Sequence, residues 1–159
     1  MLRQEQPQKE HELGPKIHAL GTNLSFMVVI TKALPKLEKL ASLLSEVHQS
    51  DGKKLIWSLK LAILALVQHK YLEHPCIGVK LPVASCLSNI MMLTAPIPPY
   101  NDDIMRRVFR LIVETFQDLD NSEGPIFGKR LEILEVMALV RSYDLMFELE
   151  CDDLILQMF

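Results

Sequence analysis

The stretch VKLPVASCLSNIMMLTAPIPPYN, residues 79–101, decides the fold class. Its first part predicts a helix from about Val79 to Leu93, because apolar residues recur there at helical spacing. Residues 95–100 hold three prolines and predict a rigid, extended linker, after which Asn101 is a favourable N-cap for another helix. The apolar helical positions are Leu81, Ala84, Leu87, Ile90 and Met91.

Helical patterns also flank this stretch. Residues 35–47 carry one apolar stripe, and residues 53–70 are apolar nearly all round, which predicts a helix packed between neighbours. A long helix follows the linker, another covers about residues 127–146, and a further one begins near Glu150. The stripes consist of Leu37, Leu40, Leu44 and Val47 before the linker, and of Ile104, Val108, Leu111, Ile112, Phe116 and Leu119 after it.

The N-terminal segment is interpreted differently. Residues 1–22 are polar and contain helix breakers, so they predict a flexible leader. Residues 26–30 form a short apolar run that predicts a short helix or a docked segment. Residues 23–159 are expected to form one helical domain, and the apolar stripe that begins near Glu150 stops soon afterwards, as in a fragment of something longer. The breakers are Gly14, Pro15 and Gly21.

Composition agrees with an all-α domain. The chain has 159 residues, of which 49% are hydrophobic and only 6 are glycine, and this length is typical of one domain. Pairs of helices recur about every 40–47 residues, the period of HEAT repeats, which predicts a short α-solenoid of the armadillo type. A compact helix bundle would show the same periodicity, so the pattern alone leaves both architectures open.

Charge and targeting signals disfavour several classes of protein. The 17 Lys+Arg and 20 Asp+Glu residues give a net charge of -3, which argues against a dedicated nucleic-acid binder. The N-terminus is polar where a secretory signal would be apolar. Residues 81–101 are uncharged and long enough to span a bilayer, but four prolines argue against a membrane helix. The three cysteines lack a CxxC spacing and indicate a reducing compartment.

No pattern predicts an enzyme, a metal or a cofactor. The sequence lacks the usual nucleophile, phosphate-binding and metalloprotease motifs. His69, His74 and Cys76 form one loose cluster without the second close pair that zinc sites usually have. The paired acids at residues 102–103 and 152–153 each open a predicted helix, where capping explains them better than metal binding.

Two features are candidates for binding a partner. Arg106, Arg107 and Arg110 share the polar side of the helix after the linker, and such a basic patch can grip phosphate or an acidic peptide. A solvated face balanced by acidic neighbours is the favoured alternative. Tyr100, beside the rigid prolines, predicts an exposed contact surface that costs little conformational entropy to order. The alternative there is a hinge that only spaces two pairs of helices.

Two segments resemble a known family of cohesin regulators. Residues 83–90 read VASCLSNI and residues 95–100 read APIPPY, which is similar to the V-A-x-C-L-x-x-I and A-P-x-x-P-Y motifs of the Precocious-Dissociation-of-Sisters (Pds-five) proteins. Residues 134–151 resemble the same family's L-E-x-x-A-x-V-R/K-S…L-E-C stretch. The likeness covers about residues 37–159, and residues 101–103 look most similar to the plant branch.

The resemblance implies a nuclear HEAT-repeat scaffold without catalytic activity. Such a scaffold docks onto cohesin subunits and onto cohesin release and establishment factors. It reaches chromatin indirectly, and it supports sister chromatid cohesion and DNA repair in dividing cells. The family's A-P-x-x-P-Y turn receives short peptide motifs, which implies partner-binding roles for Ala95, Pro96, Pro99 and Tyr100.

This chain departs from the family pattern within that turn. Ile97 stands where the family usually has an acidic residue, and Pro98 replaces a small one. A basic group of a bound peptide therefore loses its ion pair at this position. The alternative function is a truncated structural remnant that keeps the helical fold and binds no partner.

Overall fold

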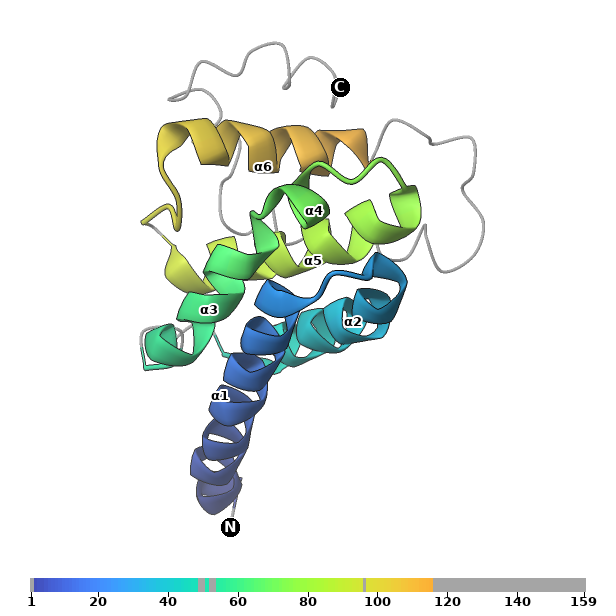
Figure 1. Ribbon diagram of the computed structural model, residues 1–159. Coiled ribbons are helices and arrows are strands. Elements are labelled where there is room, and N and C mark those ends of the chain that lie inside the picture. The colour runs from blue at the N-terminus through green and yellow to red at the C-terminus, as the bar shows by residue number, and fades with distance from the viewer. Residues whose placement is uncertain (1, 49–50, 52–53, 96, 116–159) are drawn as a thin grey trace, which may run out of the picture.

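The described part of the chain forms six helices in the computed structural model, which covers residues 2–48, 51, 54–95 and 97–115 (Figure 1). No strand occurs among these residues. The helices predicted at about residues 127–146 and from Glu150 lie outside the described residues, as does the part of the helix after the linker that is predicted beyond residue 115. The helices are α1 (Leu2–Phe26), α2 (Ile30–Glu46), α3 (Ile56–Leu66), α4 (His69–Leu72), α5 (Ile77–Thr94) and α6 (Asp102–Glu114).

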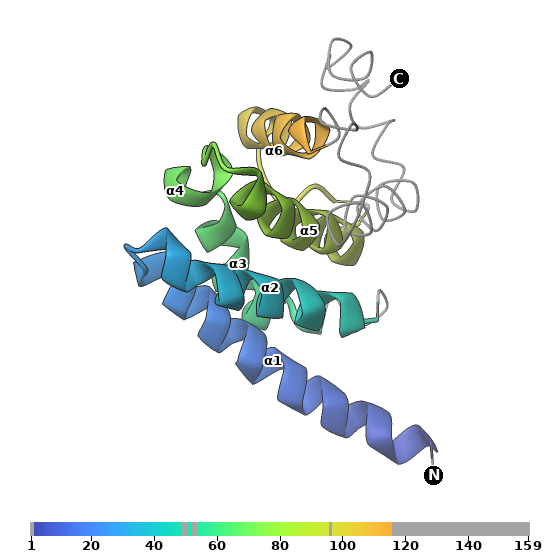
Figure 2. The same cartoon turned by 90° about the vertical axis from the view of Figure 1, so that its right-hand side faces the viewer.

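The helices stack in layers from the N-terminus onward (Figure 2). Helix α1 packs against α2 and α3, and α5 lies between this group and α6. The short α4 contacts both α5 and α6. Each layer therefore contacts mainly the layers next to it in sequence, which is the arrangement of a solenoid.

Helix α5 is the buried centre of this stack. Nearly every residue from Val79 to Leu93 is buried. The hydroxyl of Ser88 and the amide of Asn89 both donate to the carbonyl of Ser85, at 3.0 and 2.8 Å, so these buried polar groups are satisfied within the helix. By length and composition α5 is the one described helix that could cross a membrane. Its burial among neighbouring helices accounts for that composition.

Helix α2 presents the apolar stripe that the sequence predicts. Leu37 and Leu40 are fully buried, and the thiol of Cys86 in α5 lies 3.4 Å from the Leu37 carbonyl. Cys86 is itself buried, as expected for a small core residue. The helix begins at Ile30, earlier than the predicted start at Pro35. Burial of the stripe therefore outweighs the one backbone hydrogen bond that this proline removes.

Helix α1 corrects the prediction for the N-terminal segment. The sequence predicts a flexible leader at residues 1–22, but Leu2–Phe26 form one helix. Its apolar side chains recur at helical spacing and are buried, and such packing stabilises a helix more than local propensity does. The prediction is wrong because polar residues and helix breakers interrupt this apolar stripe in the sequence, so its helical spacing is not recognised. Its members are Leu13, Ile17, Leu20 and Leu24.

Two of the supposed breakers are contact points between helices. A Cβ atom on Gly14 would lie 2.9 Å from the hydroxyl oxygen of Ser58, and one on Gly21 would lie 2.6 Å from the backbone nitrogen of Ala62. Both neighbours belong to α3. Gly21 therefore lets the backbones of α1 and α3 approach closely, and Gly14 leaves room for the Ser58 side chain. Both glycines lie inside a continuous helix.

Residues 54–70 form two helices where the sequence predicts one. Helix α3 ends at Leu66, the backbone of Gln68 is extended, and α4 begins at His69. The predicted burial on all sides is also wrong, because large apolar side chains lie exposed on the outer face of α3. These side chains are Ile56, Trp57 and Leu64.

Helix α4 holds the end of α1. The ammonium of Lys70 donates to the carbonyls of Ser25 and Met27, at 3.0 and 2.5 Å. The hydroxyl of Tyr71 donates to the Leu24 carbonyl at 2.6 Å, and burial raises the pKa of this phenol. Helix α1 has no basic residue in its last turn, so Lys70 supplies the positive charge that a helix C-terminus favours. These bonds also fix the connection to α2, where the sequence predicts a short helix or a docked segment.

Candidate docking surface

The proline-rich linker is anchored at both of its ends. The amide of Ile97 donates to the Thr94 carbonyl at 3.1 Å, at the end of α5. At the start of α6, the side-chain oxygen of Asn101 accepts from the amide of Ile104 at 3.0 Å. Asn101 is therefore the N-cap that the sequence predicts. The linker is a fixed turn between the two helices.

Tyr100 tethers this turn to α3. Its hydroxyl donates to the carbonyl of Ile63 at 2.6 Å. Burial, with a contribution from the nearby Cys86 thiol, raises the pKa of its phenol. The sequence predicts an exposed tyrosine here, but the side chain is partly buried because its hydroxyl reaches a backbone carbonyl on another helix. Two of the other residues predicted to bind a partner, Ala95 and Pro99, are also partly buried. The third, Pro96, lies outside the described residues.

An apolar groove opens beside this turn, on the outer face of α3. It has a volume of about 440 Å³. Its largest side chains face solvent, since Trp57 is 78% exposed, Leu64 55% and Ile56 52%. In the adjoining turn, Ile97 is 71% exposed. We refer to this surface as the α3 groove, which is lined by Ile56, Trp57, Lys60, Ile63, Leu64 and Pro99.

Lys60 is the one ionisable residue among the described residues that line the α3 groove. Its ammonium lies 5.3 Å from the centre of the Trp57 ring, within the range of a cation–π interaction. Sequence reasoning missed this surface because it assigned the apolar circumference of α3 to burial. A lysine three residues after a tryptophan lies on the same helix face, and this pairing is the signal that could have marked the face as exposed.

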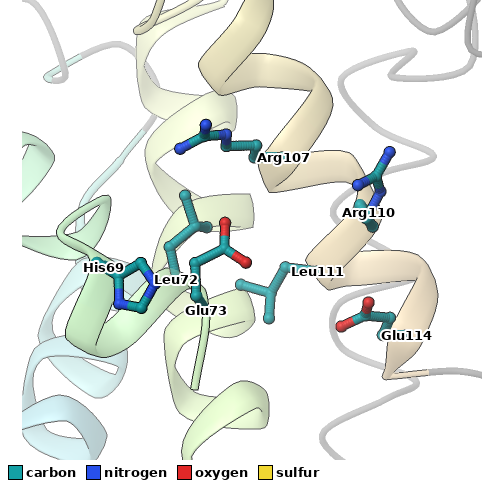
Figure 3. A pocket seen from close by; sticks show the side chains of 7 residues that line it. All are labelled: His69, Leu72, Glu73, Arg107, Arg110, Leu111 and Glu114. Carbon is teal, nitrogen blue, oxygen red and sulfur yellow. The ribbon is translucent and has the colours of Figure 1, made fainter. Parts of the chain in front are cut away.

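A second cavity lies between α4 and α6 (Figure 3). Its volume is about 350 Å³. Arg107 reaches from α6 toward the side of α4, where the carboxylate of Glu73 lies, whereas Arg110 points in a different direction. Glu114 is already paired with Lys80 at 2.7 Å. The lining is therefore mixed in charge, and consists of His69, Leu72, Glu73, Arg107, Arg110, Leu111 and Glu114.

The structure divides the three arginines that the sequence groups as a basic patch. Arg107 and Arg110 line the second cavity. Arg106 instead lines a separate, open depression with the residues that begin α6, and its guanidinium lies 3.6 Å from the Asp103 carboxylate. Within the described residues, acidic side chains accompany the arginines at both places, so the arginines do not form one continuous basic surface.

The loose cluster of potential metal ligands is also dispersed. His69 lines the second cavity, whereas the Nδ1 atom of His74 accepts from the backbone amide of Cys76 at 3.1 Å. Over the described ranges, no group of three or more His, Cys, Asp or Glu side chains is placed to hold a metal ion.

The fold matches a solved helical-repeat protein. The structure resembles a chain of the solved Pds5–Scc1 complex with a TM-score of 0.72 and 26% sequence identity. The match covers 84% of this chain and 20% of the other one. The protein is therefore an all-α, HEAT-like solenoid, as the sequence predicts, and not the compact bundle that periodicity alone left open.

Sequence comparisons then give the family. Residues 31–159 match the family model described as sister chromatid cohesion protein PDS5. The chain is 41% identical to PDS5 homolog A of Arabidopsis thaliana over 145 residues, which is 91% of this chain and 9% of the relative. It is 42% identical to homolog C of the same plant over 130 residues, or 82% of this chain and 15% of the relative. The chain belongs to the PDS5 family of sister chromatid cohesion proteins.

The comparisons confirm the resemblance seen in the motifs, including its likeness to the plant branch. Homolog A of Danio rerio is 35% identical over a shorter stretch of 98 residues, which covers 60% of this chain and 7% of the relative. The chain spans no more than 15% of the length of these three relatives. It corresponds to a short part of these longer relatives.

Proposed function

We propose that this chain is a nuclear, non-catalytic docking domain of cohesin regulation. It binds a short segment of a cohesin subunit, or of a cohesin release or establishment factor, in the α3 groove. Through this contact it contributes to sister chromatid cohesion and DNA repair in dividing cells. Family membership supports the role in cohesion, and the match to a chain of the Pds5–Scc1 complex supports a cohesin subunit as partner.

One observation carries the docking role: the exposed tryptophan beside the family's turn. Trp57 is 78% exposed, and it shares the α3 groove with Pro99 of that turn. Exposed apolar patches of this kind mark interaction sites on soluble proteins, and tryptophan is prominent among the residues that contribute most to binding energy.

The groove is also held in shape before any partner arrives. The hydroxyl of Tyr100 ties the turn to the backbone of α3 at Ile63, and the ammonium of Lys60 lies over the ring of Trp57. A partner that binds here therefore orders few protein groups, which lowers the entropic cost of association.

The titratable groups around the groove support binding more than reaction. The partial burial of Tyr100 raises the pKa of its phenol, and its hydroxyl already donates to a backbone carbonyl. The neutral phenol is thus a structural donor. Lys60 is positioned against an aromatic ring, and among the described lining residues no acid or base stands beside it.

The test is recovery of cohesin from a plant nuclear extract by the tagged full chain. Wild type is compared with Trp57→Ala, which removes the centre of the groove. Phe26→Ala is the matched control, because Phe26 is also a large exposed aromatic residue but lies at the end of α1, outside the groove. We expect wild type and Phe26→Ala to recover cohesin subunits or release factors, and Trp57→Ala to lose most of them.

Two outcomes contradict the proposal. Equal recovery by Trp57→Ala would place docking elsewhere on the chain. No recovery by a wild-type protein that is helical and monomeric in solution would favour the structural remnant, which keeps the fold and binds no partner.

A further inference from the structure

Charge is distributed unevenly around the α3 groove. Five of its lining residues are apolar, and Lys60 is the only described one that ionises. Lys54, one turn before Trp57, is largely exposed and lies 3.9 Å from the Asp51 carboxylate, a weak contact. The lining of the α3 groove is therefore apolar, with one positive charge at its edge, that of Lys60.

The two acidic residues that follow the proline-rich turn do not line the α3 groove. Asp102 and Asp103 follow the turn but line a separate depression together with Arg106, and Asp103 pairs with that arginine at 3.6 Å. Within the turn itself, the exposed Ile97 stands as an apolar residue. A cationic ligand would therefore find apolar surface and an ammonium, with no described carboxylate in the lining.

We infer that the α3 groove selects a peptide segment in which a bulky apolar residue is flanked by aspartate or glutamate. The apolar side chain lies between Trp57 and Pro99, where it is removed from water, and the carboxylate pairs with Lys60 at the rim. This inference rests on the proposed function, and adds the chemistry of the partner to it. The ion pair between Lys60 and the peptide carboxylate is exposed to solvent, so it changes the affinity only modestly. Burial of the apolar residue supplies most of the binding free energy.

Intrinsic fluorescence tests the inference directly, since Trp57 is the chain's only tryptophan. Three short peptides share a central Phe-Leu pair and differ only in their flanks, which are Glu, Gln or Lys. Each is titrated against the full chain at low salt. We expect the Glu peptide to bind about tenfold more tightly than the Lys peptide, with the Gln peptide between them, and the difference to shrink as salt screens the pair.

Charge reversal at the rim supplies the decisive comparison. Lys60→Glu is expected to abolish or invert the order of the three peptides. Lys39→Glu is the matched control: Lys39 is an exposed lysine of α2, so this variant changes the net charge of the protein equally but leaves the groove alone. It is expected to keep the wild-type order.

The possible failures are distinguishable. Binding that requires Trp57 but is equal for all peptides, or tightest for Lys, overturns the inference and leaves the proposed docking role intact. No fluorescence change with any peptide overturns the inference, while the docking role is decided separately by the recovery of cohesin from nuclear extract. Sedimentation that shows a dimer broken by Leu64→Glu would also overturn the inference, because the groove would then be covered by a second copy of the chain.

Discussion

Helices α5 and α3 are similar in sequence character and opposite in environment. Both are apolar around most of their circumference. Helix α5 buries this surface because it lies in the middle of the stack, with α2, α3, α4 and α6 around it. Helix α3 packs on α1 and α5 and leaves its outer face to solvent. An apolar circumference therefore indicates a core helix in one layer of a solenoid and a helix with an exposed apolar face in another.

The largest expected effect separates the two helices by stability. Leu87, in α5, is fully buried, so Leu87→Ala should lower the free energy of unfolding by about 2–5 kcal/mol. Trp57→Ala should change it by less than about 0.5 kcal/mol, because the ring is mostly exposed. Urea unfolding followed by circular dichroism measures both. If Trp57→Ala lowered the free energy of unfolding as much as Leu87→Ala, the tryptophan would be a core residue. The proposed difference between α3 and α5 would then be wrong.

A second comparison concerns how closely α3 is held on its inner side. Gly21→Ala places a methyl group 2.6 Å from the backbone nitrogen of Ala62. A backbone atom of α3 cannot move away as a side chain can, so the two helices must separate. We expect a loss of about 1–3 kcal/mol in the free energy of unfolding. Gly78→Ala is the control, since its Cβ would meet only the Cys76 sulfur at 3.6 Å. Because alanine favours helix, that variant should be neutral or more stable by up to about 1 kcal/mol.

The third prediction distinguishes the tether from the contact surface. Tyr100→Phe removes the hydrogen bond to Ile63 and leaves the ring in place, so the free energy of unfolding should fall by about 1 kcal/mol. Binding of the Glu-flanked peptide should weaken by no more than about threefold, because the tether that holds the turn is lost but the groove's apolar lining is kept. A tenfold loss of affinity without loss of stability would instead make Tyr100 a contact residue.

The same variant carries a pH signature. The folded state raises the pKa of Tyr100, so it holds the phenol proton more tightly than the unfolded chain does. This contribution to stability is fully present below the unfolded pKa of about 10 and is lost as the pH rises above it, by roughly 1.4 kcal/mol per pH unit. Tyr100→Phe should therefore lose stability less steeply than wild type between about pH 10 and 11. Parallel curves would mean that Tyr100 ionises freely in the folded state.

The contrast between α3 and α5 also shows what the sequence could predict. The stripe through Leu37 and Leu40, the cap at Asn101 and the buried Cys86 were predictable because local spacing and capping chemistry determine them. The break between α3 and α4 was not, since Gln68 has no proline or glycine beside it. The exposed face of α3 depends on which neighbours exist in space, and periodicity does not contain that information.

Helix α1 shows a different limit. Glycine often ends or interrupts a helix, so Gly14 and Gly21 read as breakers in the sequence. Only the position of α3 reveals that both glycines leave room for its residues. The turn illustrates the same point at the candidate site. The motif predicts contact residues that include the tether Tyr100, whereas Trp57 and Lys60 of the α3 groove lie some forty positions away in the sequence. Only the fold brings these two residues next to the turn.

The smallest effect is expected at the arginines of α6. Arg107 and Arg110 line a cavity that also holds Glu73 and the paired Glu114. An anionic peptide would therefore meet carboxylates there, and the screening length at physiological salt, about 8 Å, limits any long-range attraction. The double variant Arg107→Gln and Arg110→Gln should change the affinity for the Glu-flanked peptide by less than about twofold, as should the control Arg106→Gln. A loss as large as that of Lys60→Glu, confined to the double variant, would move the acid-binding site from α3 to the cavity between α4 and α6.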